Sequence, residues 1–243
     1  MPVLAMPEDV NGATIVGILG GMGPAATADF YLKLINATPA EKDQDHIRTV
    51  IWSDPTVPDR SAALIGGGED PTPYLVRGAH RLADCGASFI VIPCNTAHAF
   101  RVAIEQATGV PVLDMIAATA SALGTGVPTP SAVGVLATDG TLSTGLYREA
   151  LTAEGYRSIE PDSEVQLRLM DALASIKAGD VGRQTQTGLG QAANHLVGRG
   201  ADVLIAGCTE VVLGLRSDCV SVPVIDPAQV LAELIVKLVY PES

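Results

Sequence analysis

The stretch GASFIVIPCNT at residues 86–96 decides the fold, because GADVLIAGCTE at residues 200–210 repeats it. Each copy is an apolar run that ends in a cysteine, Cys94 or Cys208, followed by polar residues. Two more pairs of similar segments occur in the same order and at nearly the same spacing: VGILGG (16–21) with VGVLAT (133–138), and VPVLD (110–114) with VPVID (222–226). The repeats predict two similar α/β halves related by a pseudo-twofold axis, with the two cysteines face to face across a cleft.

Short apolar runs alternate with helical periodicity along both halves. Strands are expected at 14–20, 49–52, 88–92, 110–113, 132–136, 203–206 and 222–225. Helices are expected at 25–37, 71–85, 96–108, 143–155, 164–178, 183–199 and 227–239. Strands that alternate with helices form parallel sheets with right-handed crossovers. The predicted fold class is therefore α/β.

The predicted domain boundaries follow from the repeat. The segment 124–130, rich in Gly, Pro and Thr, is typical of a linker. Because the last strand and helix follow the second copy, we expect the chain to return to the first half. We therefore predict a first domain of residues 1–117 plus 226–243, which carries Cys94, and a second of residues 118–225, which carries Cys208.

Composition limits the classes of function. The 243 residues are 47% hydrophobic and carry a net charge of −12, which argues against a nucleic-acid partner. The apolar runs are too short to span a bilayer, and residues 1–10 show no basic secretory n-region, so we expect no membrane association. The four cysteines form no CxxC pair, and a cytoplasmic location with free thiols is predicted.

Cys94 and Cys208 are the strongest candidates for chemistry. Ligands of open parallel sheets bind beyond the carboxyl ends of the strands, where both cysteines are expected. A single buried cysteine is usually structural, but two at equivalent strand ends favour a function. Two thiols across a cleft suit a reaction that removes a proton from one face of a carbon and returns it on the other. Cys85 and Cys219 have no counterparts and are interpreted as structural or incidental.

Polar residues beside the two cysteines have two interpretations. Asn95, Thr96 and Thr209 supply donors suited to an α-carboxylate, and they are also ordinary N-caps. His98 follows Cys94 by one helical turn and either lowers a thiol pKa or packs. The role of Glu210 is equally undecided by the sequence.

Other candidates lie outside the repeated cysteine segments. The turn GGMGP (20–24) lacks the third glycine of a dinucleotide fingerprint, so it is either a carboxylate-binding turn or a plain connection. Arg60 binds a carboxylate, or it pairs with its neighbour Asp59. Lys177 closes a predicted helix, where a cation favours the helix dipole.

Seven segments together resemble the aspartate/glutamate racemase family, which needs no pyridoxal phosphate: GILGGMGPAATADFY (17–31), VPDRSAAL (57–64), VIPCNTAH (91–98), GVLATDGT (134–141), SIKAGD (175–180), AGCTE (206–210) and VPVIDP (222–227). The resemblance implies two Rossmann-like domains, an active site in the cleft between them, commonly a homodimer, and no metal or organic cofactor. It implies that Cys94 and Cys208 are the acid/base pair. The substrate-binding set that it implies comprises Met22, Arg60, Asn95, Thr96, Thr138, Lys177 and Thr209, with Asp59, His98 and Glu210 in support.

The predicted function is the interconversion of L- and D-aspartate or glutamate by proton transfer at Cα. A broad-spectrum amino acid racemase of the same superfamily is the first alternative. From other classes, a thiol redox protein and a non-catalytic amino-acid-binding protein stay open, although the missing CxxC speaks against the former. Which cysteine rests as the thiolate is not decided by the sequence.

Overall fold

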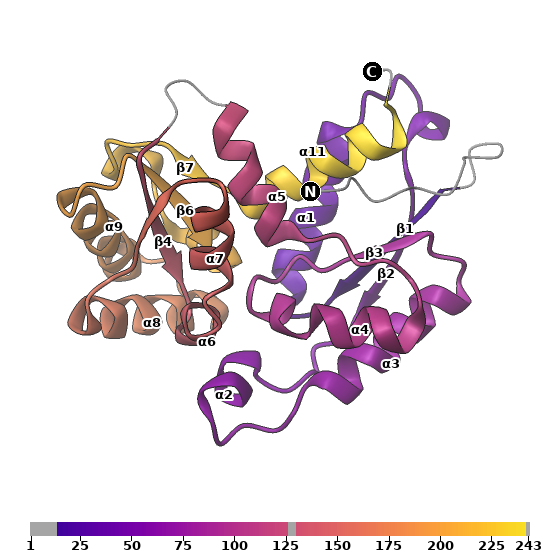
Figure 1. Cartoon of the computed structure of the whole chain (residues 1–243), viewed down its shortest axis with the longest axis horizontal. Coiled ribbons are helices and arrows are strands. Elements are labelled where there is room, and N and C mark those ends of the chain that lie inside the picture. Colours follow the sequence, from indigo (N-terminus) through magenta and orange to yellow (C-terminus); the bar gives the residue numbers. More distant parts are fainter. Residues whose placement is uncertain (1–13, 126–129, 242–243) are drawn as a thin grey trace.

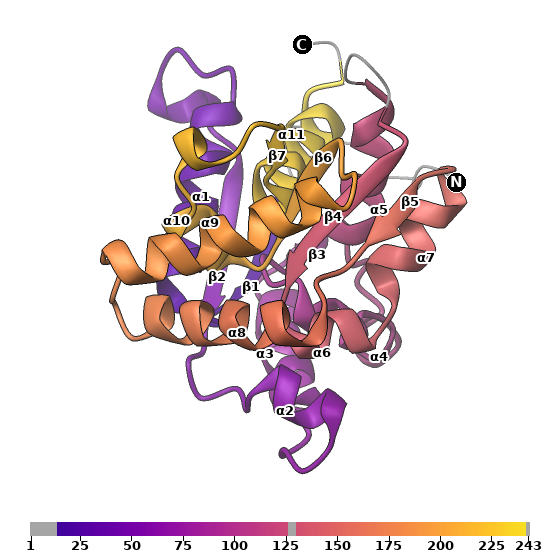
Figure 2. The same cartoon turned by 90° about the vertical axis from the view of Figure 1, so that its left-hand side faces the viewer.

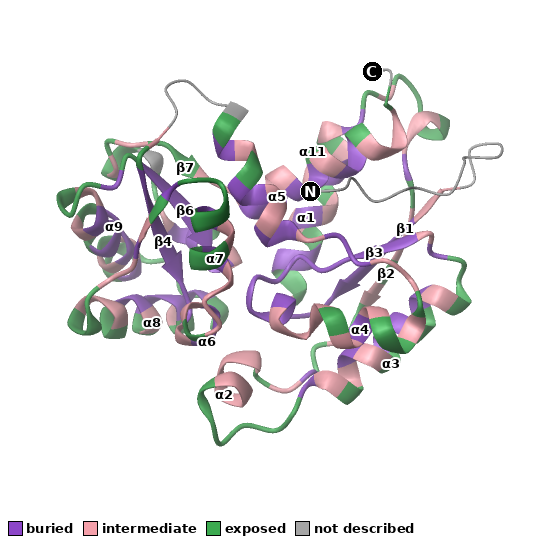
Figure 3. Ribbon diagram, in the orientation of Figure 1, coloured by how far each residue is buried: buried purple, intermediate pink, exposed green. Residues whose placement is uncertain are grey.

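Two lobes, each built on its own parallel sheet, make up the chain. The computed structural model describes residues 14–125 and 130–241. Figure 1 shows the first lobe on the right, with β1 to β3, and the second on the left, with β4, β6 and β7. Helices flank both sheets, and the middle strand of each sheet, β1 or β4, is buried (Figure 3). The two-lobed α/β fold with parallel sheets is confirmed.

The first sheet has the strand order β2-β1-β3. Its strands are β1 (Ile15–Gly20), β2 (Arg48–Ser53) and β3 (Phe89–Val91), and all pairs are parallel. Beyond β3, a single parallel bridge joins Ile90 to Val112. The strand expected at 110–113 is thus only this bridge.

The second sheet repeats this order as β5-β4-β6-β7. Its strands are β4 (Ala132–Ala137), β5 (Arg157–Ile159), β6 (Val203–Gly207) and β7 (Val224–Ile225). β4 is central in the second sheet, as β1 is in the first. β6 corresponds to β3, and β7 corresponds to the bridge at Val112. Cys94 and Cys208 therefore follow equivalent strands, and the duplication expected from the sequence is present in the topology.

Helices of the first lobe begin and end where the local sequence dictates. They are α1 (Pro24–Ala37), α2 (Arg60–Ile65), α3 (Thr72–Asp84), the 3₁₀ turn η2 (Thr96–Phe100) and α4 (Arg101–Thr108), with a short 3₁₀ turn at Asp43–Asp45. Pro24 stands at the first position of α1, where its missing N–H costs nothing. Gly109 ends α4 with a φ of 68°, a conformation that glycine adopts freely.

The second lobe carries α6 (Asp139–Ser143), α7 (Leu146–Ala153), α8 (Ser163–Lys177), α9 (Arg183–Gly198) and α10 (Thr209–Gly214), with a 3₁₀ turn at Ser217–Cys219. Figure 2 shows α8 and α9 side by side. Their buried residues, Leu173 and Leu196 among them, share one core with Leu204 of β6.

Two helices connect the lobes. α11 (Pro227–Val239) buries Leu231 and Ile235 in the first-lobe core beside Phe30, so the chain does return to the first half. β7, in contrast, stays in the second sheet. α5 (Met115–Ala122) contributes Met115 to the first core and its next turns to the second, and is followed by a 3₁₀ turn at Leu123–Thr125. The expected boundary at 117 falls inside α5, and residues 126–129 of the expected linker lie outside the described residues.

Some sequence expectations are wrong in detail. The helix expected at 96–108 begins as a 3₁₀ turn and becomes α-helical only at Arg101. The helix expected at 143–155 begins only at Leu146 as α7, because Gly145, with a φ of 70°, separates it from the short helix α6, which ends at Ser143. The short elements α2, α5, β5 and α10 were not expected, because pieces of three to eight residues carry little periodicity.

Candidate active site

A small cavity lies where the strand ends of the two lobes meet. Its free space is about 20 Å³, room for little more than one water molecule. It is lined by Met22, Asp59, Arg60, Ser61, Cys94, Asn95, Thr96, Thr138, Lys177, Cys208, Thr209 and Glu210. Every residue that the sequence predicted for the site lines this cavity except His98. Ser61 is the one addition.

Cys94 is buried at the end of the β3 segment, and His98 fixes its backbone. The Nδ1 of His98 lies 2.9 Å from the Cys94 carbonyl oxygen, and the N–H of Met115 donates to Nε2 over 3.2 Å. Nε2 must therefore be unprotonated, so Nδ1 carries the proton and donates. Burial lowers the pKa of His98, which keeps the ring neutral. Of its two interpretations, the geometry supports packing, because the ring holds the main chain and makes no hydrogen bond to the thiol.

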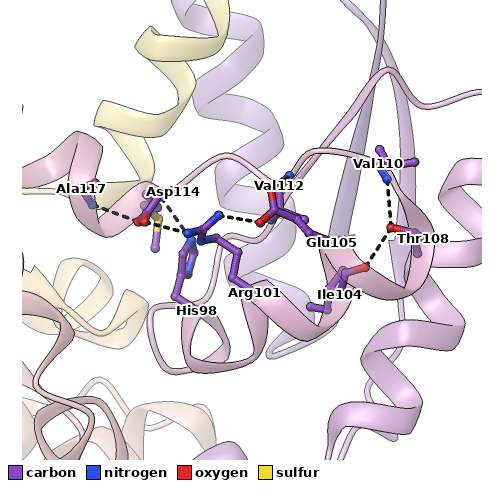
Figure 4. Close-up of polar contacts among 10 residues, drawn as sticks. His98, Arg101, Ile104, Glu105, Thr108, Val110, Val112, Asp114 and Ala117 are labelled. Carbon is purple, nitrogen blue, oxygen red and sulfur yellow. Dashed lines mark hydrogen bonds and ion pairs between the residues drawn. The ribbon is translucent and has the colours of Figure 1, made fainter. Parts of the chain in front are cut away.

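The segment around His98 is fixed by charged contacts (Figure 4). Arg101 donates to Glu105 over 2.8 Å and lies 3.5 Å from Asp114 at the start of α5. Glu105 also accepts from the Val112 N–H over 2.9 Å. These contacts tie the helix after Cys94 to the chain that crosses to the second lobe.

Cys208 has a different environment from Cys94. It is the N-cap residue of α10, and its Sγ donates to Glu210 Oε2 over 2.9 Å. The Thr209 hydroxyl donates to the same oxygen over 3.0 Å. The pKa of Cys208 lies well above its ordinary value, first because burial disfavours a thiolate and then because Glu210 repels it, while Lys177 acts in the opposite direction. Cys208 therefore rests as a thiol.

Hydroxyl groups connect the lobes beside Cys94. The Thr96 hydroxyl of the first lobe lies 3.1 Å from that of Thr138 and 2.8 Å from that of Thr141, both in the second. Ser61 of α2 donates to Thr138 over 3.1 Å. Asn95 makes no capping bond, and its Oδ1 instead accepts from the buried Tyr147 hydroxyl over 2.5 Å.

Arg60 and Lys177 bring positive charge to the cavity. Arg60 Nη1 donates to the carbonyls of Val57 and Pro58, over 3.1 and 3.0 Å, and its Nε is buried without a partner. The alternative in which Arg60 pairs with Asp59 is not realised, because Asp59 accepts from the Ala62 N–H and caps α2. Within residues 14–125 and 130–241, neither cation forms an ion pair with a carboxylate. Their free positive charge favours an anionic ligand.

Two other kinds of feature are absent from the described part of the chain. It contains no group of three or more His, Cys, Asp or Glu side chains that could hold a metal ion. None of its helices is long and apolar enough to cross a membrane.

Comparison with known proteins agrees with this geometry. The model of the Asp/Glu/hydantoin racemase family matches residues 19–235. The chain belongs to this family. It is 31% identical to the broad specificity amino-acid racemase RacX of Bacillus subtilis, over 90% of this chain and 95% of that protein. The family assigns the protein to the racemases, isomerases that act on amino acids.

Solved structures of racemases share the fold. Picrophilus torridus aspartate racemase is 31% identical, with a TM-score of 0.76 over 93% of this chain and 94% of that one. A glutamate racemase from Francisella tularensis, in complex with D-glutamate, is 18% identical with a TM-score of 0.71, over 95% of this chain and 82% of that one. The second likeness supports the fold alone.

Sequence reasoning missed three residues at the cavity or in contact with its lining. Ser61 lies within the quoted segment VPDRSAAL, next to Arg60. Its place in the first turn of α2 turns it toward the cavity, and a prediction of that helix would have identified it. Thr141 likewise lies within a quoted segment, GVLATDGT, whereas Tyr147 shows no signal in one sequence, since a tyrosine on a short helix is an ordinary core residue. Only the approach of the lobes brings them to Thr96 and Asn95.

Proposed function

We propose that this racemase interconverts the L and D forms of aspartate or glutamate by two-base proton transfer between Cys94 and Cys208. The observation that carries the proposal is that both thiols line one small cavity, each from an equivalent strand end of its own lobe. One cysteine, as thiolate, takes the α-proton, and the other, as thiol, protonates the opposite face of Cα. The enzyme is left with the two protonation states exchanged, ready for the other enantiomer.

The surroundings of the two thiols differ in this proposal. Cys208 donates to Glu210 and keeps its proton, whereas no carboxylate of the described chain accepts from the Cys94 thiol. Cys94 is thus the base in one direction and Cys208 the acid. In the other direction Cys208 must give up its proton beside Glu210.

Donors around the α-carboxylate stabilise the charge that develops as the proton leaves. Asn95 and Thr96 offer such donors from the Cys94 side, and Thr209 from the Cys208 side. Thr138 and Met22 complete the wall. The two thiols supply both proton steps, so the proposed reaction uses no metal or organic cofactor and is expected to survive dialysis against a chelator.

Arg60 and Lys177 support an acidic side chain as the preferred substrate. Both are cations of the cavity wall without a carboxylate partner in the described chain, and the Arg60 Nε still needs an acceptor. Aspartate racemase activity in the Picrophilus relative agrees with this preference. The name of the Bacillus relative favours the broad-spectrum alternative.

The assembly and location belong to the same proposal. We expect the domains to be residues 1–117 with 226–243, and 118–225, in a cytoplasmic homodimer. All four cysteines are free, with Cys85 and Cys219 exposed, which suits a reducing compartment. Light scattering of the purified chain and fractionation of its cells test the two expectations.

The proton-transfer test compares four cysteine variants. Cys94→Ala and Cys208→Ala should each abolish racemisation of aspartate and glutamate. Racemisation is measured by chiral chromatography and by deuterium uptake at Cα. Cys85→Ala and Cys219→Ala are the matched controls and should keep most of the activity. Near-normal racemisation by either of the first pair would exclude the two-base mechanism. Failure of the wild-type protein to exchange the α-proton of any amino acid would leave the two non-racemase alternatives, an amino-acid-binding protein and a thiol redox protein.

The substrate test uses Arg60→Ala and a panel of L- and D-amino acids. A charge-assisted hydrogen bond is worth roughly 1.5–3 kcal/mol, so its loss should lower kcat/KM for an acidic substrate about tenfold to a hundredfold. Alanine or serine should be affected far less. Equal losses across the panel, or a wild-type preference for a neutral or basic amino acid, would favour the broad-spectrum alternative.

A further inference from the structure

Tyr147 contacts a neighbour of each of the two cysteines. It belongs to α7 of the second lobe, and its hydroxyl crosses to the first lobe to donate to Asn95 Oδ1, directly after Cys94. Its ring lies against Gly207, directly before Cys208, where an added Cβ would be 3.3 Å from the ring carbon Cε2. Tyr147 and Asn95 are only 3% and 4% exposed. One buried side chain thus spans the two strand ends that carry the thiols.

The hydrogen bond from Tyr147 determines which way the Asn95 carboxamide faces. A carboxamide has one acceptor oxygen and an NH₂ group with two donors. Because the oxygen accepts from the phenol, the NH₂ group is directed away from Tyr147. No residue in the described part of the chain accepts a hydrogen bond from this NH₂ group, and Asn95 lines the cavity. The free donors are therefore available to a ligand.

The phenol stays a donor over the working range of pH. Burial raises the pKa of Tyr147 well above its ordinary value, since a phenolate would be poorly solvated there. An ionised phenol would accept from the NH₂ group instead and turn the carboxamide over. The surroundings of Tyr147 prevent this inversion.

We propose that Tyr147 is a positioning residue for racemisation, which holds the Asn95 NH₂ toward the substrate α-carboxylate and spaces the two strand ends that carry the cysteines. The inference rests on the proposed function, in which Asn95 stabilises the charge that develops on that carboxylate. A donor fixed before the reaction contributes more than one that must be oriented during it. The effect of Tyr147 should therefore appear in kcat more than in KM.

The first test removes one hydroxyl group. Tyr147→Phe should lower kcat about tenfold with a change in KM below about twofold, since the lost orientation matters most in the transition state. Tyr156→Phe is the matched control, because Tyr156 is buried in the same core but adjoins the opposite end of the sheet, beside β5. It should keep wild-type kinetics, and both variants should melt within a few degrees of the wild type. Equal kinetics of the two variants, or loss of the fold in Tyr147→Phe alone, would overturn the proposal.

The second test asks whether Tyr147 acts through Asn95. Asn95→Ala should lower kcat on the order of a hundredfold or more. Adding Tyr147→Phe to it should lower kcat no further, because the group that Tyr147 positions is already gone. Losses that multiply in the double variant would contradict the positioning role. Full activity of Asn95→Ala would instead contradict the proposed function, so the two failures are distinguishable.

Discussion

At the scale of residues, the two thiols of this racemase are related by the repeat but differ in their partners. The Cys208 thiol donates to Glu210, whereas the side chain that bonds to Cys94 is a neutral His98, which donates to the Cys94 carbonyl. Loss of the Cys208 proton would place two anions 2.9 Å apart in a buried site. Glu210 therefore determines how readily Cys208 gives up its proton.

Glu210→Gln should lower the pKa of Cys208, because it removes the carboxylate that repels the thiolate. The measurement is the ultraviolet absorbance of the thiolate against pH, in a protein whose other three cysteines are alanine. The midpoint should move to lower pH in Glu210→Gln and stay high in Glu210→Asp, which keeps the charge. An unchanged midpoint in Glu210→Gln would show that burial alone controls this thiol.

Repetition made the proposed catalytic cysteines predictable, and the absence of repetition hid their partners. Cys94 and Cys208 occur at equivalent places in a duplicated pattern, so one sequence is enough to single them out. Glu210 stayed ambiguous, because its role depends on the rotamer that turns its carboxylate to Sγ. Tyr147 could not be found at all, since its partner Asn95 lies in the other lobe.

At the scale of elements, α2 delivers Arg60 to the cavity and is held there by a close contact with α6. A Cβ on Gly140 of α6 would lie 2.4 Å from the Cα of Ser61, so the backbones meet without room for a side chain. The sequence did not predict α2, because its six residues follow Pro55 and Pro58 and precede three glycines. A segment that short shows no helical period, and its contact with α6 fixes its place.

Gly140→Ala should move α2 away from the second lobe and carry Arg60 with it. We expect kcat/KM for an acidic amino acid to fall on the order of tenfold or more, as for loss of one charge-assisted bond. Gly188→Ala in α9 is the control, because its Cβ would make an ordinary 3.6 Å contact with Ala172. That variant should keep full activity and gain up to about 1 kcal/mol of stability. Wild-type activity of Gly140→Ala would show that the lobes tolerate a wider approach.

At the scale of the whole molecule, the site exists only where the lobes meet. Residues from both lobes line a cavity with little free space, so we expect the lobes to part when a substrate enters. The alternation of strands and helices predicted both lobes and the return of α11. It could not predict how closely they approach, since that depends on contacts such as Thr96 with Thr138 and Ser61 with Gly140.

A substrate held by both lobes should stabilise the whole protein against unfolding. Binding to the native state alone adds about 2.7 kcal/mol when the ligand is present at a hundred times its Kd, and each kcal/mol raises Tm by about 2–4 °C in a chain of this size. We expect D- and L-aspartate or glutamate to raise Tm by about 5–10 °C at saturation, measured by scanning calorimetry.

Arg60→Ala isolates the part of that stabilisation that comes from the side-chain carboxylate. Its Tm without ligand should stay near that of the wild type, because Arg60 donates only to backbone carbonyls and makes no ion pair within residues 14–125 and 130–241. The shift with aspartate should shrink in this variant toward that given by alanine. An equal shift by aspartate and alanine in the wild type would mean that Arg60 and Lys177 do not contact the substrate side chain. The stabilisation by bound substrate would then depend on its α-carboxylate alone.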